Sequence, residues 1–297
     1  MASSNRSAEV GRFAPSPTGP LHLGSLLTAV ASWLDARAHA GRWLVRIEDL
    51  DEPRCVPGAA DAILRTLERH ALEWDALSYQ HQRIELYRDA IARLDADGRL
   101  FACTCSRNQL QDSTIYPGTC RNRRATPEEP CALRVRVTDE TLQLVDGIQG
   151  TYVQRLDRDV GDFVVYRRDG IAAYQLAVVV DDAAQHISRV VRGADLLDNT
   201  PRQLYLFRLL KLRPPQYLHV PVLADRSGHK LSKHEHAMTI DGFEPGVNLE
   251  LILTLLGHDP PRALQHAPPR DLLAWAVSQW NPSHVPRGVV HPGFVCI

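Results

Sequence analysis

The sequence predicts an α/β protein whose parallel sheet is interrupted by an insertion of different character. Two observations lead to this prediction. Residues 10–47 follow a strand–helix–strand pattern, the βαβ unit of parallel sheets. Residues 103–131 are instead rich in Cys, Arg, Thr, Pro and Asn and show little periodicity. At 297 residues the chain can bury a sizeable core in one large domain or two modest ones.

The first elements follow from the spacing of apolar residues. Residues 10–14 are expected to form a strand, and residues 43–47 a second, buried one. A helix between them should begin near His22 and end before Gly41. Its apolar positions recur at helical spacing: Leu23, Leu26, Leu27, Val30 and Leu34. Two further helices are expected over residues 59–72 and 83–94.

Later elements are shorter until the helical signal returns. Strand-like pieces are expected at residues 132–137, 142–145 and 163–166, and helices at 200–211, 249–256 and 271–280, before a Pro-rich tail. We therefore expect four segments. They are residues 9–101 (first half of the α/β domain), 102–170 (an α+β insertion), 171–240 (second half) and 241–297 (a helical stub and tail).

Composition is ordinary for a globular protein, with 44% hydrophobic and 23% charged residues. The most apolar stretch, residues 171–180, is too short to span a bilayer. The first ten residues contain no apolar run of the kind found in secretory signals. We therefore expect a cytoplasmic protein without a membrane partner. A net charge of −1 provides no global basic field that would indicate a nucleic-acid partner.

Arginine is nevertheless crowded locally. Such a group fits either a solvated surface or a nucleic-acid contact, and charge alone does not separate the two. Its members are Arg121, Arg123, Arg124, Arg134, Arg136, Arg155, Arg158, Arg167 and Arg168. Lysine, by contrast, occurs only at Lys211, Lys230 and Lys233.

Two segments carry chemistry. RFAPSPTGPLHLGS, from Arg12 to Ser25, lies between the first strand and the first helix, where unpaired N–H groups favour phosphate. The same residues would also suit an ordinary turn. The second segment, Lys230-Leu-Ser-Lys233, holds two of the three lysines in a loop with Gly and Ser. Mobile ammonium groups stabilise phosphate charge in a transition state, although a solvated turn is the simpler alternative.

Together the two segments resemble the paired signatures of class I aminoacyl-tRNA synthetases. RIEDLDEPR (from Arg46) and VVRGADLLDNTPRQ (from Val190) are similar to the glutamyl group of that class, and the resemblance runs from about Arg12 to Met238. It implies a Rossmann-like catalytic domain that activates glutamate with Mg-ATP as an adenylate. The chain departs from the strongest motif forms at Ser25 and His234, where the family patterns have His and Ser.

The resemblance also implies roles for individual residues. The glutamate site would comprise Arg12, Phe13, Ala14, Pro15, Ser16, Glu48, Tyr174 and Arg192. Arg12 would pair with the side-chain carboxylate of the substrate and Glu48 with its ammonium group. ATP would be bound by His22, Gly24 and Lys233, and the catalytic residues would be His22, Lys230 and Lys233.

Three cysteines form a group in the insertion. Cys103, Cys105 and Cys120 suit a structural zinc site that staples a small knuckle. Chemistry alone makes Cys131 the conventional fourth ligand, and free reduced cysteines without a metal are the alternative. A Cys3Tyr set with Tyr116 as the fourth ligand is what the resemblance to glutamyl-Q tRNA(Asp) synthetases implies.

Only fifty-nine residues follow Met238. An independent anticodon-reading domain needs on the order of 100 residues, so we expect none. This truncation, with the cysteine pattern, resembles the glutamyl-Q tRNA(Asp) synthetases, which attach glutamate to queuosine in the tRNA(Asp) anticodon. A monomer that binds tRNA(Asp) carrying queuosine is then implied. The alternatives are a truncated glutamyl-tRNA synthetase that charges the 3′ end, a non-catalytic tRNA- or nucleotide-binding regulator, and a nucleotidyltransferase for another acid.

Overall fold

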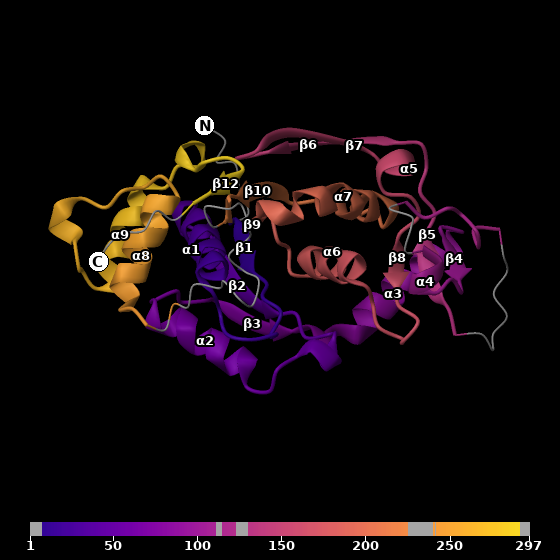
Figure 1. The fold of residues 1–297 in the computed structure, drawn as a ribbon, viewed down its shortest axis with the longest axis horizontal. Helices are drawn as coiled ribbons and strands as arrows, with labels where there is room; N and C mark the ends of the chain where they lie inside the picture. The colour runs from indigo at the N-terminus through magenta and orange to yellow at the C-terminus, as the bar shows by residue number, and fades with distance from the viewer. Residues whose placement is uncertain (1–7, 111–114, 123–129, 225–239, 241, 292–297) are drawn as a thin grey trace, which may run out of the picture.

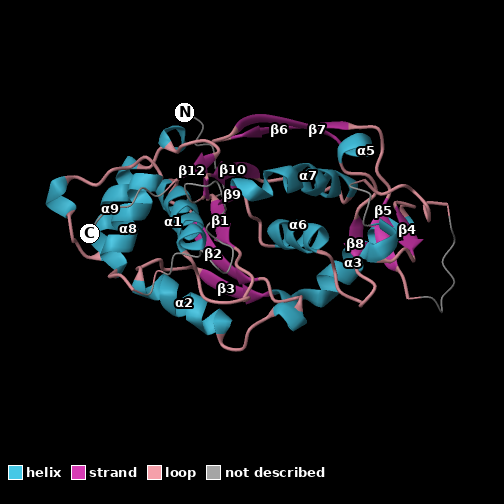
Figure 2. Cartoon of the chain, in the orientation of Figure 1, coloured by secondary structure: helices cyan, strands magenta, loops and turns pink. Residues whose placement is uncertain are grey.

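The computed structural model describes residues 8–110, 115–122, 130–224, 240 and 242–291 (Figures 1 and 2). Lys230 and Lys233 therefore lie outside the described residues. The predicted strand–helix–strand unit is present: β1 (Val10–Phe13), α1 (Leu23–Ala38) and β2 (Arg42–Ile47). The two strands pair in parallel, with Val10 opposite Arg42.

Three further strands extend this unit into a five-stranded arrangement. β3 (Ala76–Tyr79) pairs in parallel with β2, and β10 (Gln216–Val220) pairs in parallel with β9 (Arg189–Gly193). The two sheets meet where the Ser188 N–H, next to β9, donates to the Val10 carbonyl at 2.9 Å. The spatial order is therefore β3–β2–β1–β9–β10. Ligands of such sheets bind where the strand order reverses, at the carboxyl ends of β1 and β9.

Helices cover the parallel strands. α1 lies against β1 and β9, and many of its side chains are fully buried, among them Leu26, Val30 and Leu34. The remaining helices of this part are α2 (Ala59–Arg69), α3 (Ile84–Ala96), α6 (Tyr174–Ala184) and α7 (Thr200–Leu209). The apolar stretch at residues 171–180 thus runs into α6, a helix of the core. No helix in the part of the chain described is long and apolar enough to cross a membrane.

The insertion is built from antiparallel strands. β4 (Leu100–Cys103), β5 (Ala132–Val135) and β8 (Val164–Tyr166) form one sheet, with α4 (Arg107–Leu110) beside it. β6 (Thr141–Asp146) and β7 (Gly150–Arg155) form a hairpin, followed by α5 (Leu156–Asp159). This hairpin runs from the insertion back towards β10 (Figure 1).

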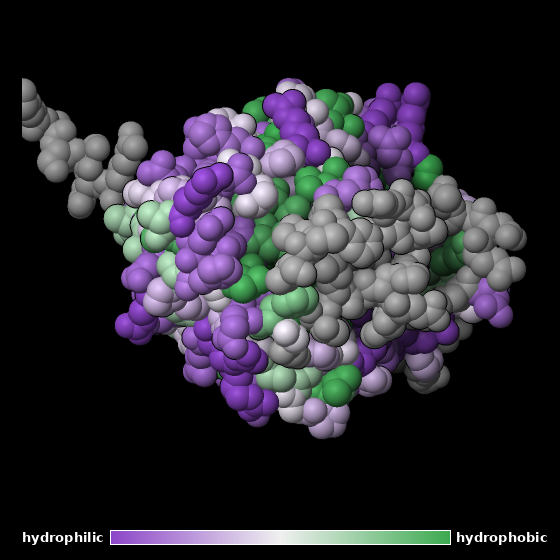
Figure 3. All heavy atoms as spheres, turned by 60° about the vertical axis from the view of Figure 1, so that its left-hand side comes forward, coloured by the Kyte–Doolittle hydropathy of each residue, from purple (hydrophilic) through white to green (hydrophobic). Residues whose placement is uncertain are grey.

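The C-terminal segment packs on the opposite end of the molecule (Figure 1). α8 (Pro245–Leu255) and α9 (Pro269–Gln279) lie against α1, and Trp280 Nε1 donates to Asp35 at 3.1 Å. On this face hydrophilic residues cover most of the coloured surface (Figure 3). The Pro-rich tail also contains a short strand, β12 (Val289–Val290), which pairs in parallel with β11 (Val222–Leu223).

Short 3-10 helices complete the described elements. They cover Glu52–Arg54, Gln80–Arg83, Ala194–Asn199, Arg262–Leu264 and Pro282–His284.

Candidate active site

A cavity of about 380 Å³ opens at the carboxyl ends of β1 and β9. Its walls come from the loop between β1 and α1, the end of β2, the start of α6, and the segments that follow β9 and β10. Every described residue predicted to bind glutamate or ATP lines it: Arg12, Phe13, Ala14, Pro15, Ser16, His22, Gly24, Glu48, Tyr174 and Arg192. Residues from distant segments of the sequence therefore form one surface in the folded protein.

Buried ion pairs fix the charged floor of this cavity. Arg12 Nε lies 3.4 Å from Asp182 Oδ1, and Arg46 Nη1 lies 2.8 Å from the same oxygen. Burial alone would raise the pKa of Asp182, but the two guanidinium groups hold it below its ordinary value. Asp182 at the end of α6 thus ties β1 to β2. Neither Asp182 nor the support from Arg46 was predicted, because nothing local in the sequence connects them.

Glu48 stands at the rim of this ion-pair cluster. Its Oε1 lies 3.3 Å from Arg46 Nη2, and its side chain is only 8% exposed. Burial raises the pKa of Glu48 above its ordinary value, and Arg46 and Arg12 oppose that shift. A carboxylate held in this state gains from any cation that enters the cavity, since the cation compensates its charge.

Tyr174 and Arg192 face each other across the cavity wall. Arg192 Nη1 lies 3.5 Å from the Tyr174 hydroxyl oxygen. The other nitrogens of Arg192 are bound to His219, at 3.0 Å, and to Thr200, at 2.9 Å. These two bonds fix one edge of the buried guanidinium. Nη1 lies on the Tyr174 side, and both residues line the cavity.

The N-terminus of α1 forms another part of the wall. His22 is the N-cap: its Nδ1 accepts the Ser25 N–H at 3.2 Å, and its Nε2 lies 2.9 Å from Ser25 Oγ. A Cβ on Gly24 would lie only 3.3 Å from the His22 ring, so glycine keeps the ring in place. The ring nitrogens therefore help to build the helix start, whose N–H groups favour an anion.

Several wall residues were not predicted from the sequence. They are Thr18, Arg54, Asp195, Leu196, Val222 and Leu223, among others. Asp195 and Leu196 lie within the quoted VVRGADLLDNTPRQ segment, directly after strand β9, and this position at a strand end was an available signal. A Cβ on Gly193 would lie 2.4 Å from Asp195 Oδ1, so a larger residue there would displace the Asp195 carboxylate.

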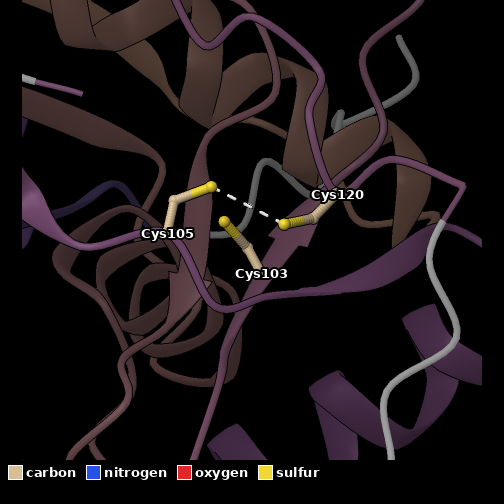
Figure 4. A group of neighbouring side chains, drawn as sticks. All are labelled: Cys103, Cys105 and Cys120. Atoms are coloured by element: carbon tan, nitrogen blue, oxygen red, sulfur yellow. Dashed lines mark hydrogen bonds between the residues drawn. The ribbon is translucent and has the colours of Figure 1, made fainter. Parts of the chain in front are cut away.

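A second group lies in the insertion, away from the cavity. The sulfur atoms of Cys103, Cys105 and Cys120 point towards one another and lie within 4.8 Å of each other (Figure 4). Cys105 and Cys120 are 3.6 Å apart. Tetrahedral zinc with sulfur at about 2.3 Å requires sulfur separations of about 3.8 Å, so the group fits this metal.

Tyr116 completes the group geometrically. Its hydroxyl oxygen lies 3.4 Å from Cys103 Sγ and accepts the Cys120 N–H at 2.8 Å. Cys131, the other fourth-ligand candidate, lies outside the set of close donor atoms. Burial opposes ionisation of Cys120, but hydrogen bonds from the Thr104 backbone, Tyr116 and Cys105 lower its pKa to about 6.

The described arginines of the insertion are largely engaged within the chain. Arg134 stacks over the Tyr116 ring at 4.0 Å, and Arg121 pairs with Asp162 at 3.1 Å. Arg168 donates to the Thr104 carbonyl, and Arg167 pairs with Asp51. Arg123 and Arg124 lie outside the described residues. Local charge alone is therefore weak evidence here for a nucleic-acid surface.

Comparison with known families decides the class of this site. Residues 10–244 match the family model of the tRNA synthetases class I (E and Q), catalytic domain. The chain belongs to this family. The synthetase motifs quoted above are thus confirmed as a family signature, and the chain has the class I synthetase catalytic fold, with a parallel sheet, of a ligase.

Curated relatives of this synthetase chain are similar over nearly their whole length. A protein of Ectopseudomonas mendocina named glutamyl-Q tRNA(Asp) synthetase is 52% identical over 282 residues, which cover 94% of this chain and 96% of the relative. One of Thiobacillus denitrificans with the same name is 52% identical and covers 97% of both chains. The resemblance to this group stated from the sequence is confirmed.

Solved structures support the same fold. A glutamate-tRNA synthetase of Elizabethkingia anophelis superposes with a TM-score of 0.81 at 22% identity, over 96% of this chain and 68% of that one. A glutamate tRNA ligase of Elizabethkingia meningosepticum, solved in complex with its amino acid, gives a TM-score of 0.80 at 21% identity, over 96% and 67%.

Proposed function

We propose that this synthetase activates glutamate with ATP and transfers the glutamyl group to queuosine in the anticodon of tRNA(Asp). The observation that supports it most is the convergence of Arg12, Glu48, Tyr174 and Arg192 on one cavity, beside the N-terminus of α1. Its relatives, at about half identity over nearly full length, carry the corresponding name.

Glutamate would lie between two cationic groups and one anionic group. Arg12 would bind the side-chain carboxylate, and Glu48 would bind the ammonium group. Arg192 and Tyr174 would close the site from the β9 side. Phe13, Ala14, Pro15 and Ser16 would form the wall along the substrate. The raised pKa of Glu48 supports this assignment, because a bound ammonium would compensate its buried charge.

ATP, as its magnesium complex, would lie along the start of α1. The helix N–H groups and its dipole would bind the phosphates, with His22 and Gly24 shaping this wall. Lys230 and Lys233 would supply positive charge to the phosphates as negative charge develops. Positioning of reactants and electrostatic stabilisation then account for catalysis, since no covalent enzyme intermediate is needed.

The reaction would proceed in two steps. An oxygen of the glutamate α-carboxylate attacks the α-phosphorus of ATP, the bond to the bridging oxygen breaks, and pyrophosphate leaves. A hydroxyl of queuosine then attacks the carbonyl carbon of the adenylate. The bond to the phosphate oxygen breaks, AMP leaves, and the hydroxyl proton passes to the departing phosphate or to water.

We further propose that Cys103, Cys105, Tyr116 and Cys120 hold one structural zinc ion. Sulfur separations that suit tetrahedral zinc and the closeness of the Tyr116 hydroxyl to Cys103 support this set. The ion would staple the insertion, which would meet the tRNA. The same proposal assigns residues 102–170 to a tRNA-facing insertion of a monomeric, cytoplasmic enzyme.

The first experiment follows labelled glutamate onto tRNA(Asp), with Mg-ATP. Three substrates are compared: tRNA with queuosine, a transcript without it, and queuosine-containing tRNA trimmed of its 3′-terminal adenosine. Label on both queuosine-containing tRNAs and not on the transcript supports the proposal. Label that depends on the terminal adenosine indicates 3′-end charging instead, and label on none of the three contradicts transfer altogether.

A further inference from the structure

Two buried side chains next to the cavity have no part in the function proposed above. Asp146 ends β6 at the turn of the hairpin, and His219 lies in β10. Both side chains are fully buried, and His219 Nδ1 lies 2.6 Å from Asp146 Oδ2. The hairpin thus carries a carboxylate from the insertion to the parallel sheet, along the path seen in Figure 1.

The carboxylate of Asp146 is saturated with donors. Its Oδ1 accepts the backbone N–H groups of Ile148, Gln149 and His219, at 3.0, 2.8 and 3.1 Å. Burial alone would raise the pKa of Asp146, but these bonds and that of the His219 ring hold it below its ordinary value. An ionised carboxylate only accepts hydrogen bonds, so the proton of His219 must be on Nδ1.

The other ring nitrogen of His219 faces Arg192. Arg192 Nε donates to His219 Nε2 at 3.0 Å, and a guanidinium has no acceptor. Nε2 must therefore carry a lone pair, which requires a neutral ring. Burial lowers the pKa of His219, and the nearby cations Arg192 and Arg12 lower it further. Asp146 raises it, but the pKa stays below its ordinary value. Tyr217 stacks on the ring at 6.1 Å between centroids.

Among the described residues, no carboxylate forms an ion pair with Arg192. Arg12 shares its charge with the carboxylate of Asp182, 3.4 Å away, whereas the direct partners of Arg192 are neutral: His219 and Thr200. The nearest carboxylate along this line, Asp146, is separated from it by the imidazole ring. Arg192 is therefore fixed in direction and retains its attraction for an anion in the cavity.

We propose that Asp146 and His219 are positioning residues for glutamate, and that they hold Arg192 through the Nδ1–H form of His219. The proposal rests on the role of Arg192 in glutamate binding proposed above. Neither residue touches the substrate, and both act through the Arg192 guanidinium. Thr200 supports the same guanidinium from α7.

Asp146→Asn tests this with almost no change of shape. The amide oxygen of asparagine would keep the three backbone N–H bonds, which places its NH2 group against His219 Nδ1. His219 would then have to carry its proton on Nε2, opposite the donor Nε of Arg192. Two facing donors cannot bond, so Arg192 loses the bond of its Nε and keeps that of Nη2 to Thr200. Its guanidinium is then less firmly oriented, although the fold is retained.

His219→Gln is the matched retaining variant. Its amide oxygen can accept from Arg192 while its NH2 group donates to Asp146, the same order of donor and acceptor as in the neutral ring. Asp157→Asn, which removes a partly exposed carboxylate paired with Arg155 in the same insertion, serves as the control.

Glutamate-dependent ATP–pyrophosphate exchange gives the first readout. We expect Asp146→Asn to raise the KM for glutamate at least tenfold, with the KM for ATP changed less than threefold and an unfolding midpoint close to that of the parent. His219→Gln should stay within threefold of the parent for both substrates, and Asp157→Asn should match the parent. An unchanged glutamate KM in Asp146→Asn, or equal rises for both substrates, overturns the proposal.

Nitrogen NMR of 15N-histidine protein gives a readout that does not depend on activity, with His219 assigned by its loss in His219→Gln. The proposal is supported if His219 carries its proton on Nδ1 in the parent and on Nε2 in Asp146→Asn. A protonated Nε2 in the parent overturns it. Failure of the proposed function would give a different result. The parent protein would then show no glutamate-dependent ATP–pyrophosphate exchange, although His219 would still carry its proton on Nδ1.

Discussion

The substrate cavity and the cysteine group are held together in different ways. The cavity collects side chains from β1, β2, α6 and β9, which buried ion pairs such as Arg12–Asp182 connect across the sheet. The three cysteines and Tyr116 all lie between residues 103 and 120, and they pack on a small core around Phe101.

The two regions therefore differ in what makes them rigid: packing of the core in one, and the proposed metal in the other. The cavity is shaped by tertiary packing within a large hydrophobic core, so its groups are in place before any ligand arrives. The cysteine group belongs to a small apolar cluster, so a bound metal would be its main source of rigidity. Changes in one region should therefore leave the other intact, and four predictions test this, beginning with the largest effect.

Arg12→Ala should lower glutamate activation by about 2–5 kcal/mol, roughly 30- to several-thousand-fold, because a desolvated carboxylate loses its partner. The free energy of unfolding should fall as well, since Arg46 is then the one remaining ion-pair partner of Asp182 among the described residues. Exchange kinetics and chemical denaturation measure the two effects. An unchanged KM and kcat for glutamate would remove Arg12 from the site.

Glu48→Gln should reduce activation by a similar factor but shift stability the other way. The folded protein raises the pKa of Glu48, so its ionised form costs stability above pH 4.5, the ordinary value, and the neutral amide avoids this cost. A higher unfolding midpoint together with lost exchange is expected from calorimetry and kinetics. Glu85→Gln, on an exposed surface pair, is the control and should change neither.

Cys105→Ser should release the metal and reduce transfer to tRNA about tenfold or more, while ATP–pyrophosphate exchange stays within threefold. Elemental analysis and the two assays measure this. Tyr116→Phe should also weaken metal retention, whereas Cys131→Ser should keep full metal content. Metal lost from Cys131→Ser and kept in Tyr116→Phe would reverse the assignment of the fourth ligand.

The smallest expected effect is a change of the free energy of unfolding with pH. His219 stays neutral in the folded protein while a histidine of the unfolded chain takes up a proton near pH 6.5, its ordinary value. The unfolded state then binds more protons, so stability falls as pH decreases below about 6.5, by at most about 1.4 kcal/mol per pH unit for one group. His219→Gln should flatten this slope in denaturation series, and His258, whose pKa burial also lowers, should account for part of the remainder. An identical slope in the variant would contradict this.

Sequence reasoning recovered what is periodic or carried by a motif. The apolar spacing in α1 predicted the helix and the two strands beside it, with bounds that differ by a residue or so. The family motifs assembled the cavity residues correctly because each motif is local. Their chemical roles remain predictions, as do the four segment boundaries.

Sequence reasoning missed contacts between residues that are distant in the chain, and it missed a helix that is buried on nearly all sides. α6 is apolar on nearly all sides, so no amphipathic period marks it, and Asp182 at its end has no neighbour in sequence that reveals its arginines. Asp146, Arg192 and His219 lie far apart along the chain. The pairing of β9 with β10 sets His219 opposite Arg192, and the β6–β7 hairpin brings Asp146 to them. β12 lies within the Pro-rich tail, and its two residues are too few to give a strand signal.

The pairing of β12 with β11 has a practical consequence for protein engineering. Val222 and Leu223 of β11 line the cavity, so the chain runs close to the substrate site at Val289 and Val290. An affinity tag or fluorescent fusion attached directly after these residues would begin close to the wall of this cavity. Val10, by contrast, begins β1 at the amino end of the strand, whereas the cavity opens at the carboxyl end. An N-terminal fusion is therefore the better choice for assays and crystallisation.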